Sequence, residues 1–246
     1  MTLELYHGWR SSASRRVRLV LAEKGLPWVG HEMDLLRGDQ HDPAYLALNP
    51  AGVVPALVHD GRVVCDSAVI AEYLDECFPQ PPLLPADPYA RAQLRTFVRW
   101  IDDQCLPHLI VFNWSQAMQP AATTWTDEQL AERLARVPSA SRREAWTRVA
   151  RQPYTDEEKA AALRGLLALA DRMLRLRADS GGPWLMGAAY TLADIAAVPF
   201  VMRISEIHPA ALDERPALAA WWAAAQARPA FAAARIEPFT ANARAA

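Results

Sequence analysis

The sequence NPAGVVPALVHDGRVVCDSAVIAEYL, residues 49–74, carries the strongest structural signals of the chain. Two β-rich runs, Pro55–Val58 and Arg62–Cys65, flank His59-Asp60-Gly61, and an Asp-Gly turn between such runs is a strong β-hairpin signal. A helix is predicted from Ser67, because apolar residues recur after it at intervals of four and three. The segment is therefore predicted to form an irregular entry, a hairpin and a helix.

The residues before this segment predict a strand, a helix and a second strand. Leu3–Tyr6 alternates apolar and polar residues, as a half-buried strand does. Apolar residues between Ala13 and Leu21 fall at helical spacing, and Gly25 ends that run. Val29–Met33 has the pattern of a second strand. This order predicts a parallel crossover, to which the hairpin adds antiparallel strands.

The residues after it predict an all-helical region. Residues 79–88 contain five prolines and no helical period, which is typical of a linker. We therefore predict one domain over residues 1–80, a linker over 81–88 and a helical domain over 89–246. Residues 115–155 interrupt the helical pattern with capping boxes and a Pro-Ser break, and we call them the excursion.

Composition excludes several classes of protein. The net charge is −2, without the strongly basic balance of a nucleic-acid binder. No apolar run is long enough to span a membrane, and the N-terminus lacks a signal-peptide pattern, so we expect a cytoplasmic protein. Three cysteines without a CxxC pair predict neither a disulfide framework nor a structural zinc site, and no metal is expected.

The first candidate functional segment is Trp9–Arg18, where a strand ends and a helix begins. A helix N-terminus presents free amides and partial positive charge, which lowers the pKa of a thiol held there, and a serine hydroxyl can donate to the thiolate. The alternative is a serine cap in a surface turn. The segment also contains four arginines, Arg10, Arg15, Arg16 and Arg18. We expect them on a solvated helix face, and the alternative is that they attract an anionic substrate.

The second segment is Asn49–Leu57, in which a Val54–Pro55 bond directly precedes a strand. We predict that this bond is cis. The backbone of Val54 can then pair with a peptide ligand as an added strand does. The alternative is a proline on an edge strand with no ligand.

The third segment is Asp66–Ile70, at the exit of the hairpin and the start of a helix. Ser67 and the helix amides suit a carboxylate, and Asp66 can pair with an ammonium group. The alternative is ordinary helix capping. As a set, the three segments fit a ligand with an α-amino acid head, a peptide-like middle and a thiol, and glutathione has that composition.

The same segments resemble a known family. Ser-Ser-x-Ser-x-Arg-Val-Arg from Ser11, Asn-Pro-x-Gly-x-Val-Pro-x-Leu from Asn49 and Asp-Ser-x-x-Ile-x-x-Tyr-Leu from Asp66 resemble the N-terminal domain of cytosolic glutathione transferases. Tyr190–Asp194 and Arg228–Phe231 are similar to landmarks of that family's helical domain. The resemblance covers nearly the whole chain and weakens in the excursion. It implies a thioredoxin-like domain (βαβ-ββα), an all-helical domain, glutathione as cosubstrate and a homodimer.

By this resemblance, Ser11 donates a hydrogen bond to the thiolate, with Ser12 as the neighbouring candidate. Val54 and Pro55 bind the cysteinyl backbone, Asp66 and Ser67 hold the γ-glutamyl end, and Gln40 or His41 reaches the glycyl carboxylate. An apolar or aromatic electrophile is expected between the two domains. Its candidate contacts, which are equally suited to the core, are Trp9, Ile110, Trp114 and Met118.

Two branches of the family compete. The turn at Arg10–Ser14 and the Asp194–Pro199 helix resemble the zeta class, which includes maleylacetoacetate isomerases. Zeta-class enzymes differ from this chain in two ways: they typically have cysteine at the position of Ala13, and they lack the excursion. The fuller layout resembles bacterial β-aryl etherases, although the Ser11-Ser12 turn departs from their usual active site.

We therefore predict a glutathione transferase that attacks an apolar electrophile, with β-aryl ether cleavage ranked first. The alternatives are a glutathione-dependent cis–trans isomerase of the maleylacetoacetate type and a non-catalytic binding protein of the same fold.

Overall fold

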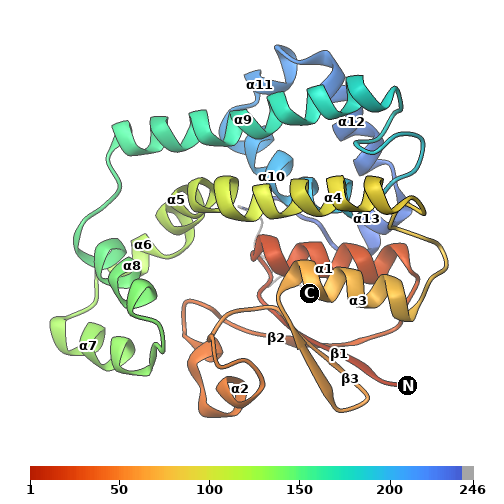
Figure 1. The fold of residues 1–246 in the computed structure, drawn as a ribbon. Coiled ribbons are helices and arrows are strands. Elements are labelled where there is room, and N and C mark those ends of the chain that lie inside the picture. Colours follow the sequence, from red (N-terminus) through yellow and green to blue (C-terminus); the bar gives the residue numbers. More distant parts are fainter. Residues whose placement is uncertain (240–246) are drawn as a thin grey trace.

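The structure is a computed structural model, and it describes residues 1–239. A small sheet lies at one end of the molecule, and a larger set of helices is stacked over the helices that cover it (Figure 1). The predicted succession of an α/β region and an all-helical region is confirmed. None of the helices in this described part of the chain is long and apolar enough to cross a membrane.

The sheet has four strands in the order β2-β1-β3-β4. β1 (Leu3–His7) pairs in parallel with β2 (Val29–Glu32) through the crossover helix α1 (Ser12–Glu23). β1 also pairs antiparallel with β3 (Ala56–His59), which forms the predicted hairpin with β4 (Arg62–Cys65). With α3 (Ser67–Cys77), the predicted βαβ-ββα order is complete.

Two local predictions near the hairpin are confirmed. The turn between β3 and β4 places Asp60 at φ 47° and Gly61 at φ 79°, in the left-handed region that suits an Asp-Gly turn. The Val54–Pro55 peptide bond is cis. Before it, a 3-10 turn (Asp39–His41) and the short helix α2 (Pro43–Leu48) lead from β2 to β3.

Helices α1 and α3 lie between the sheet and the helical region (Figure 1). Their apolar faces are fully buried against sheet residues, for example Val17 and Ile70 against the layer of Leu57. Because α1 is covered on both sides, its polar side chains are buried as well. The exposed fractions of Arg15, Arg16 and Arg18 are 1%, 3% and 2%. The predicted solvated arginine face is therefore wrong for these three residues.

Two of the buried arginines bind the end of the described chain. Arg15 donates to the carbonyl of Glu237 (2.9 Å), and Arg18 donates to the carbonyls of Ala234 (3.1 Å) and the nearby Trp9 (3.2 Å). The sequence pattern of α1 contains no sign of Ala234 and Glu237, which lie more than 200 residues away.

The helical region is built around one buried helix. α10 (Leu192–Ile207) is buried from Leu192 to Ile204, as expected for a helix that is apolar all round. A capping box between Thr191 and Asp194 begins the helix, and Pro199 lies inside the helix. The surrounding elements are α4 (Pro88–Trp100), a π-helical turn (Ile101–Cys105), α5 (Leu106–Ala117), α9 (Asp156–Ser180), α11 (Ala210–Asp213), α12 (Pro216–Gln226) and α13 (Pro229–Ala233).

The excursion folds as three short helices with a core of its own. These are α6 (Gln119–Ala122), α7 (Asp127–Arg136) and α8 (Ala140–Arg151), and they lie on the same side of the molecule as α2 (Figure 1). The predicted capping boxes at Thr126 and Thr155 are present. Trp146 is at the centre of this second core, which is separate from the main one.

Candidate active site

The turn between β1 and α1 presents two serines at a helix N-terminus. Ser11 is the N-cap residue, and its Oγ accepts a hydrogen bond from the Ser14 amide at 3.2 Å. Ser12 is the first residue of the helix, and both serines are half-buried. The first turn contains no acidic residue that would neutralise the positive end of the helix. Since Oγ of Ser11 accepts that bond, its own hydrogen remains available to a ligand.

The turn is held against the loop that carries the cis peptide. Oγ of Ser14 accepts a hydrogen bond from the Gly8 amide at 3.2 Å, and Ser14 is fully buried. A Cβ built on Gly8 would lie 3.4 Å from the Val54 side chain and 2.8 Å from that of Leu35. Glycine at position 8 therefore lets the serine turn, Val54 and Leu35 pack closely.

The backbone of Val54 lies just outside the sheet. Pairing between β1 and β3 begins at Ala56, so Val54 takes no part in that ladder. The carbonyl of the preceding Val53 accepts hydrogen bonds from the Tyr45 hydroxyl (2.5 Å) and the Asn49 amide (2.7 Å). Because these bonds hold the loop from behind, the cis-proline segment has a fixed position beside the serine turn.

At the start of α3, Asp66 and Ser67 have different surroundings. Asp66 is exposed, has φ 72°, and accepts the amides of Ala68 (2.8 Å) and Val69 (3.1 Å) with Oδ1 alone. Ser67 is 8% exposed, and its Oγ accepts a hydrogen bond from Nη1 of Arg16 at 3.1 Å.

Arg16 links this position to the helical region. Its guanidinium group donates two hydrogen bonds to Asp102, at 2.9 and 2.6 Å. Asp102 lies in the π-helical turn, and such turns often occur at functional sites. The arrangement therefore connects Ser67, α1 and the helical region through one buried cation.

Gln40 and His41 lie inside the protein. Their exposed fractions are 6% and 2%, and Gln40 donates its side-chain amide to the Leu35 carbonyl at 3.3 Å. Burial, and then the nearby Arg133, lower the pKa of His41 to about 4. At neutral pH the two side chains are therefore uncharged.

The four predicted pocket residues fall into separate groups. The Trp9 ring lies between the guanidinium groups of Arg18 (4.6 Å) and Arg235 (4.4 Å). Trp114 and Met118 pack on the core of the excursion, where Trp114 contacts Trp146 with ring centroids 4.8 Å apart. Ile110, one helical turn before Trp114 on α5, is half-buried.

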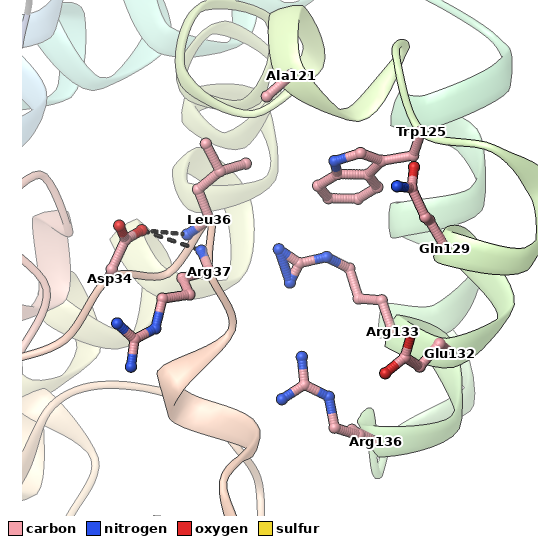
Figure 2. A pocket seen from close by; sticks show the side chains of 9 residues that line it. All are labelled: Asp34, Leu36, Arg37, Ala121, Trp125, Gln129, Glu132, Arg133 and Arg136. Atoms are coloured by element: carbon pink, nitrogen blue, oxygen red, sulfur yellow. Dashed lines mark hydrogen bonds between the residues drawn. The ribbon is translucent and has the colours of Figure 1, made fainter.

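A pocket of about 440 Å³ separates the segment after β2 from the excursion. Figure 2 shows Leu36 and Arg37 on one side and Trp125, Arg133 and Arg136 on the other. We call it the arginine pocket; it is lined by Asp34, Leu36, Arg37, Ala121, Trp125, Gln129, Glu132, Arg133 and Arg136.

With this geometry established, similarity to known proteins decides the family. The models for the N-terminal and C-terminal domains of glutathione S-transferases match residues 10–77 and 137–229. Protein LigF of Sphingobium sp. (strain NBRC 103272 / SYK-6) is 31% identical over 243 residues, which cover 94% of this chain and 91% of that protein. The chain belongs to the glutathione S-transferase family.

The solved structures agree with this assignment. The crystal structure of beta-etherase LigF from Sphingobium sp. strain SYK-6 has a TM-score of 0.84 and 30% identity, over 96% of this chain and 99% of that one. The holo structure of a maleyl pyruvate isomerase, described as a bacterial zeta-class transferase, has a TM-score of 0.71 and 27% identity, over 94% and 95% of the two chains. Maleylacetoacetate isomerase of Pseudomonas aeruginosa is 49% identical over 96 residues, 38% of this chain and 45% of that protein.

As a glutathione S-transferase, the chain is a glutathione-dependent enzyme with glutathione as cosubstrate. Sequence reasoning missed two residues that this transferase brings to the site, Arg16 and Asp102. The sequence pattern predicts a solvated face for Arg16, and Asp102 lies 86 residues further along in a stretch whose sequence has an ordinary amphipathic helical pattern. No local signal pairs them, because their contact exists only when α1 packs on the helical region.

Proposed function

We propose that this transferase activates the glutathione thiol with the hydroxyl of Ser11. The observation that carries the proposal is the position of Ser11 at the N-cap of α1, with its own hydrogen available and Val54 beside the same turn. A hydroxyl donor and the positive helix end both stabilise the thiolate, which lowers the thiol pKa. Ser12, one residue into the helix, is the second candidate donor.

The rest of glutathione is assigned along the same surface. The cysteinyl backbone pairs with Val54, the residue before Pro55. The backbone N–H and C=O of Val54 take no part in the pairing of β1 with β3, so they are free to pair with a peptide in this way. The γ-glutamyl end lies at Asp66 and Ser67, where α3 begins. The glycyl end lies near Gln40 and His41, which supply shape and polarity but no charge.

The electrophile is proposed to be a β-aryl ether held between the two regions, against Trp9, Ile110, Trp114 and Met118. Similarity to LigF over almost the whole length of both chains, a length that includes most of the excursion, supports this choice. The thiolate sulfur forms a bond to the carbon that bears the aryloxy group. The carbon–oxygen bond breaks, and both electrons of that bond leave with the phenolate, which then takes a proton from water.

A cis–trans isomerase is the second candidate. The stretch that is 49% identical to a maleylacetoacetate isomerase favours it. The two reactions differ in stoichiometry, because an isomerase returns free glutathione whereas ether cleavage consumes it and releases a phenol.

The decisive experiment compares wild type with Ser11→Ala and Ser12→Ala. Calorimetry measures glutathione binding, and chromatography measures phenol release from a phenacyl aryl ether and isomerisation of maleylacetoacetate. We expect Ser11→Ala to bind glutathione but to lose about 100-fold in kcat/KM, as is typical when one charge-stabilising donor is removed. A Ser11→Ala enzyme with wild-type turnover overturns the role of Ser11. Glutathione binding without turnover of either substrate favours a binding protein.

Three further proposals do not depend on the geometry of the site: the location and the domain bounds rest on the sequence pattern, and the dimer rests on the family. The enzyme is cytoplasmic, it forms a homodimer, and its domains span residues 1–80 and 89–246 with a linker over 81–88. The last seven residues lie outside the described part of the chain. Light scattering tests the dimer, fractionation tests the location, and limited proteolysis tests the linker.

A further inference from the structure

The arginine pocket contains a buried guanidinium group that forms no close ion pair with the described residues. Arg133, on α7 of the excursion, is 8% exposed, and its Nη1 has no hydrogen-bond partner. The charge of Asp34 acts on this guanidinium group from across the pocket, but among residues 1–239 no ion pair within 4 Å includes Arg133. A buried donor with no partner is costly, so such a group indicates a missing acceptor.

Two indole rings hold this guanidinium group in place. It lies 4.3 Å from the ring centroid of Trp125 and 4.8 Å from that of Trp146. Cation–π contacts of this kind stabilise the charge but accept no N–H···O hydrogen bond. The position of Arg133 is therefore fixed by the excursion, while its hydrogen-bonding capacity remains unused.

Two further arginines belong to the lining. Figure 2 shows Arg136 beside Arg133, whereas the Arg37 side chain comes from the opposite wall and turns away from both. They are paired outside the lining, Arg37 with Asp39 at 3.0 Å and Arg136 with Asp42 at 3.4 Å.

Two acidic residues also line the pocket. Oδ1 of Asp34 accepts the amides of Leu36 and Arg37, each at 3.0 Å, and Glu132 is exposed on α7. The lining itself therefore has three arginines and two carboxylates, and Asp39 and Asp42 pair with two of those arginines from outside it. Among the described residues, Arg133 is left as the arginine of the lining without an ion pair within 4 Å.

The size and position of the pocket identify what it holds. A volume of about 440 Å³ is that of a small-molecule site rather than of one carboxylate group. Leu36, Ala121 and Trp125 supply apolar wall. The adjacent Leu35 lies against the position of a Gly8 Cβ beside Val54, so the pocket borders the proposed glutathione site.

We propose that the arginine pocket binds an oxyanion, such as a carboxylate, on the electrophile, so that this enzyme prefers an aromatic substrate with an anionic group to a neutral one. The electrophile part of this inference rests on the proposed function. A guanidinium group matches a carboxylate with two parallel N–H···O bonds, so Arg133 recognises the anion and the apolar wall receives the ring.

The first measurement is binding without turnover. Calorimetry compares 4-nitrobenzoate with the neutral 4-nitrobenzamide on the protein without glutathione. We expect the anion to bind about 10- to 100-fold more tightly, and Arg133→Gln to remove the difference. Arg136→Gln is a second variant that leaves the two-indole contact intact, and we expect it to reduce the difference about fivefold. Arg164→Gln, an exposed arginine on α9, is the control and should keep it.

The second measurement is turnover with 4-chloro-3-nitrobenzoate and 4-chloro-3-nitrobenzamide, each divided by its uncatalysed rate with glutathione. In both, the sulfur–carbon bond forms and chloride leaves with the bonding electrons. The anionic substrate should have the higher normalised kcat/KM, and Arg133→Gln and Arg136→Gln should lower it for that substrate alone.

The outcomes separate the sources of the anion. Equal binding of the two nitrobenzene ligands to wild type overturns the proposal. So does a variant that weakens glutathione binding and slows both substrates equally, because the pocket then serves a carboxylate of glutathione. Anion-selective binding without any turnover supports the pocket while the proposed transferase reaction fails.

Discussion

Asp102→Asn tests whether the helical region organises the glutathione site through Arg16. The substitution keeps one oxygen acceptor but removes the charge that faces the guanidinium group. Removing one partner of a fully buried ion pair costs about 3–5 kcal/mol. The Arg16 side chain is 3% exposed, whereas that of Asp102 is 32% exposed, and water therefore replaces part of the lost interaction.

We expect Asp102→Asn to lower the free energy of unfolding by about 2 kcal/mol, less than the fully buried value. For a chain of this size, this corresponds to a decrease of about 4–8 °C in Tm. Ser67 also loses the fixed orientation of its donor, because Arg16 binds both residues. We expect glutathione to bind about fivefold more weakly, a difference of about 1 kcal/mol.

The assay combines thermal unfolding with glutathione calorimetry, and Asp103→Asn is the matched control. Asp103 is the next residue, is 54% exposed, and pairs with Arg99 at 3.3 Å one turn away. Such an exposed pair contributes about 0.5 kcal/mol or less. The reasoning is refuted when the two variants have the same Tm and the same glutathione affinity as wild type.

Other perturbations probe buried charge and backbone conformation. Burial, and then a neighbouring arginine, lower the pKa of His7 to about 4, so the neutral imidazole is the folded form. The contribution of neutral His7 to the free energy of unfolding is therefore fully present above about pH 6.5. It decreases as the pH falls towards 4, because over that range only the unfolded chain takes up the proton. The urea midpoint of His7→Gln should therefore decrease less than that of wild type between pH 6.5 and 4. Gly38→Ala should destabilise the fold by about 1–3 kcal/mol, because φ is 95° and the new Cβ would lie 2.7 Å from Nη1 of Arg133. Urea unfolding measures it, and an unchanged midpoint contradicts the argument. Lys24→Met should cost about 3–5 kcal/mol in the same assay, because it leaves the buried carboxylate of Asp75 without its cation, and an additional Asp75→Leu change should restore part of that loss.

The elements that the sequence predicted are those with short-range causes. The Asp60-Gly61 hairpin and the capping boxes at Thr126 and Thr155 each depend on residues within a few positions of one another. Hydrogen bonds between a side chain and a nearby amide form wherever the local sequence allows them, so pattern alone identifies them.

The arginines of α1 show where such reasoning ends. An Arg-rich helix favours a solvated face when nothing is known of its neighbours. The fold places α1 between two layers, and the carbonyls of Ala234 and Glu237 receive Arg18 and Arg15. The burial of Arg15 and Arg18 depends on acceptors that another segment supplies, and that segment is remote in sequence.

The order of elements, the α/β and helical regions, the cis Val54–Pro55 bond and the family motifs around Ser11, Val54 and Ser67 could all be predicted from the amino-acid sequence. The pairing of charges could not: Arg16 meets Asp102, and Arg133 meets two indole rings and, among the described residues, no ion-pair partner within 4 Å. Local conformation follows from interactions along the chain, whereas burial, pKa and ligand recognition follow from what the folded chain places across from each group.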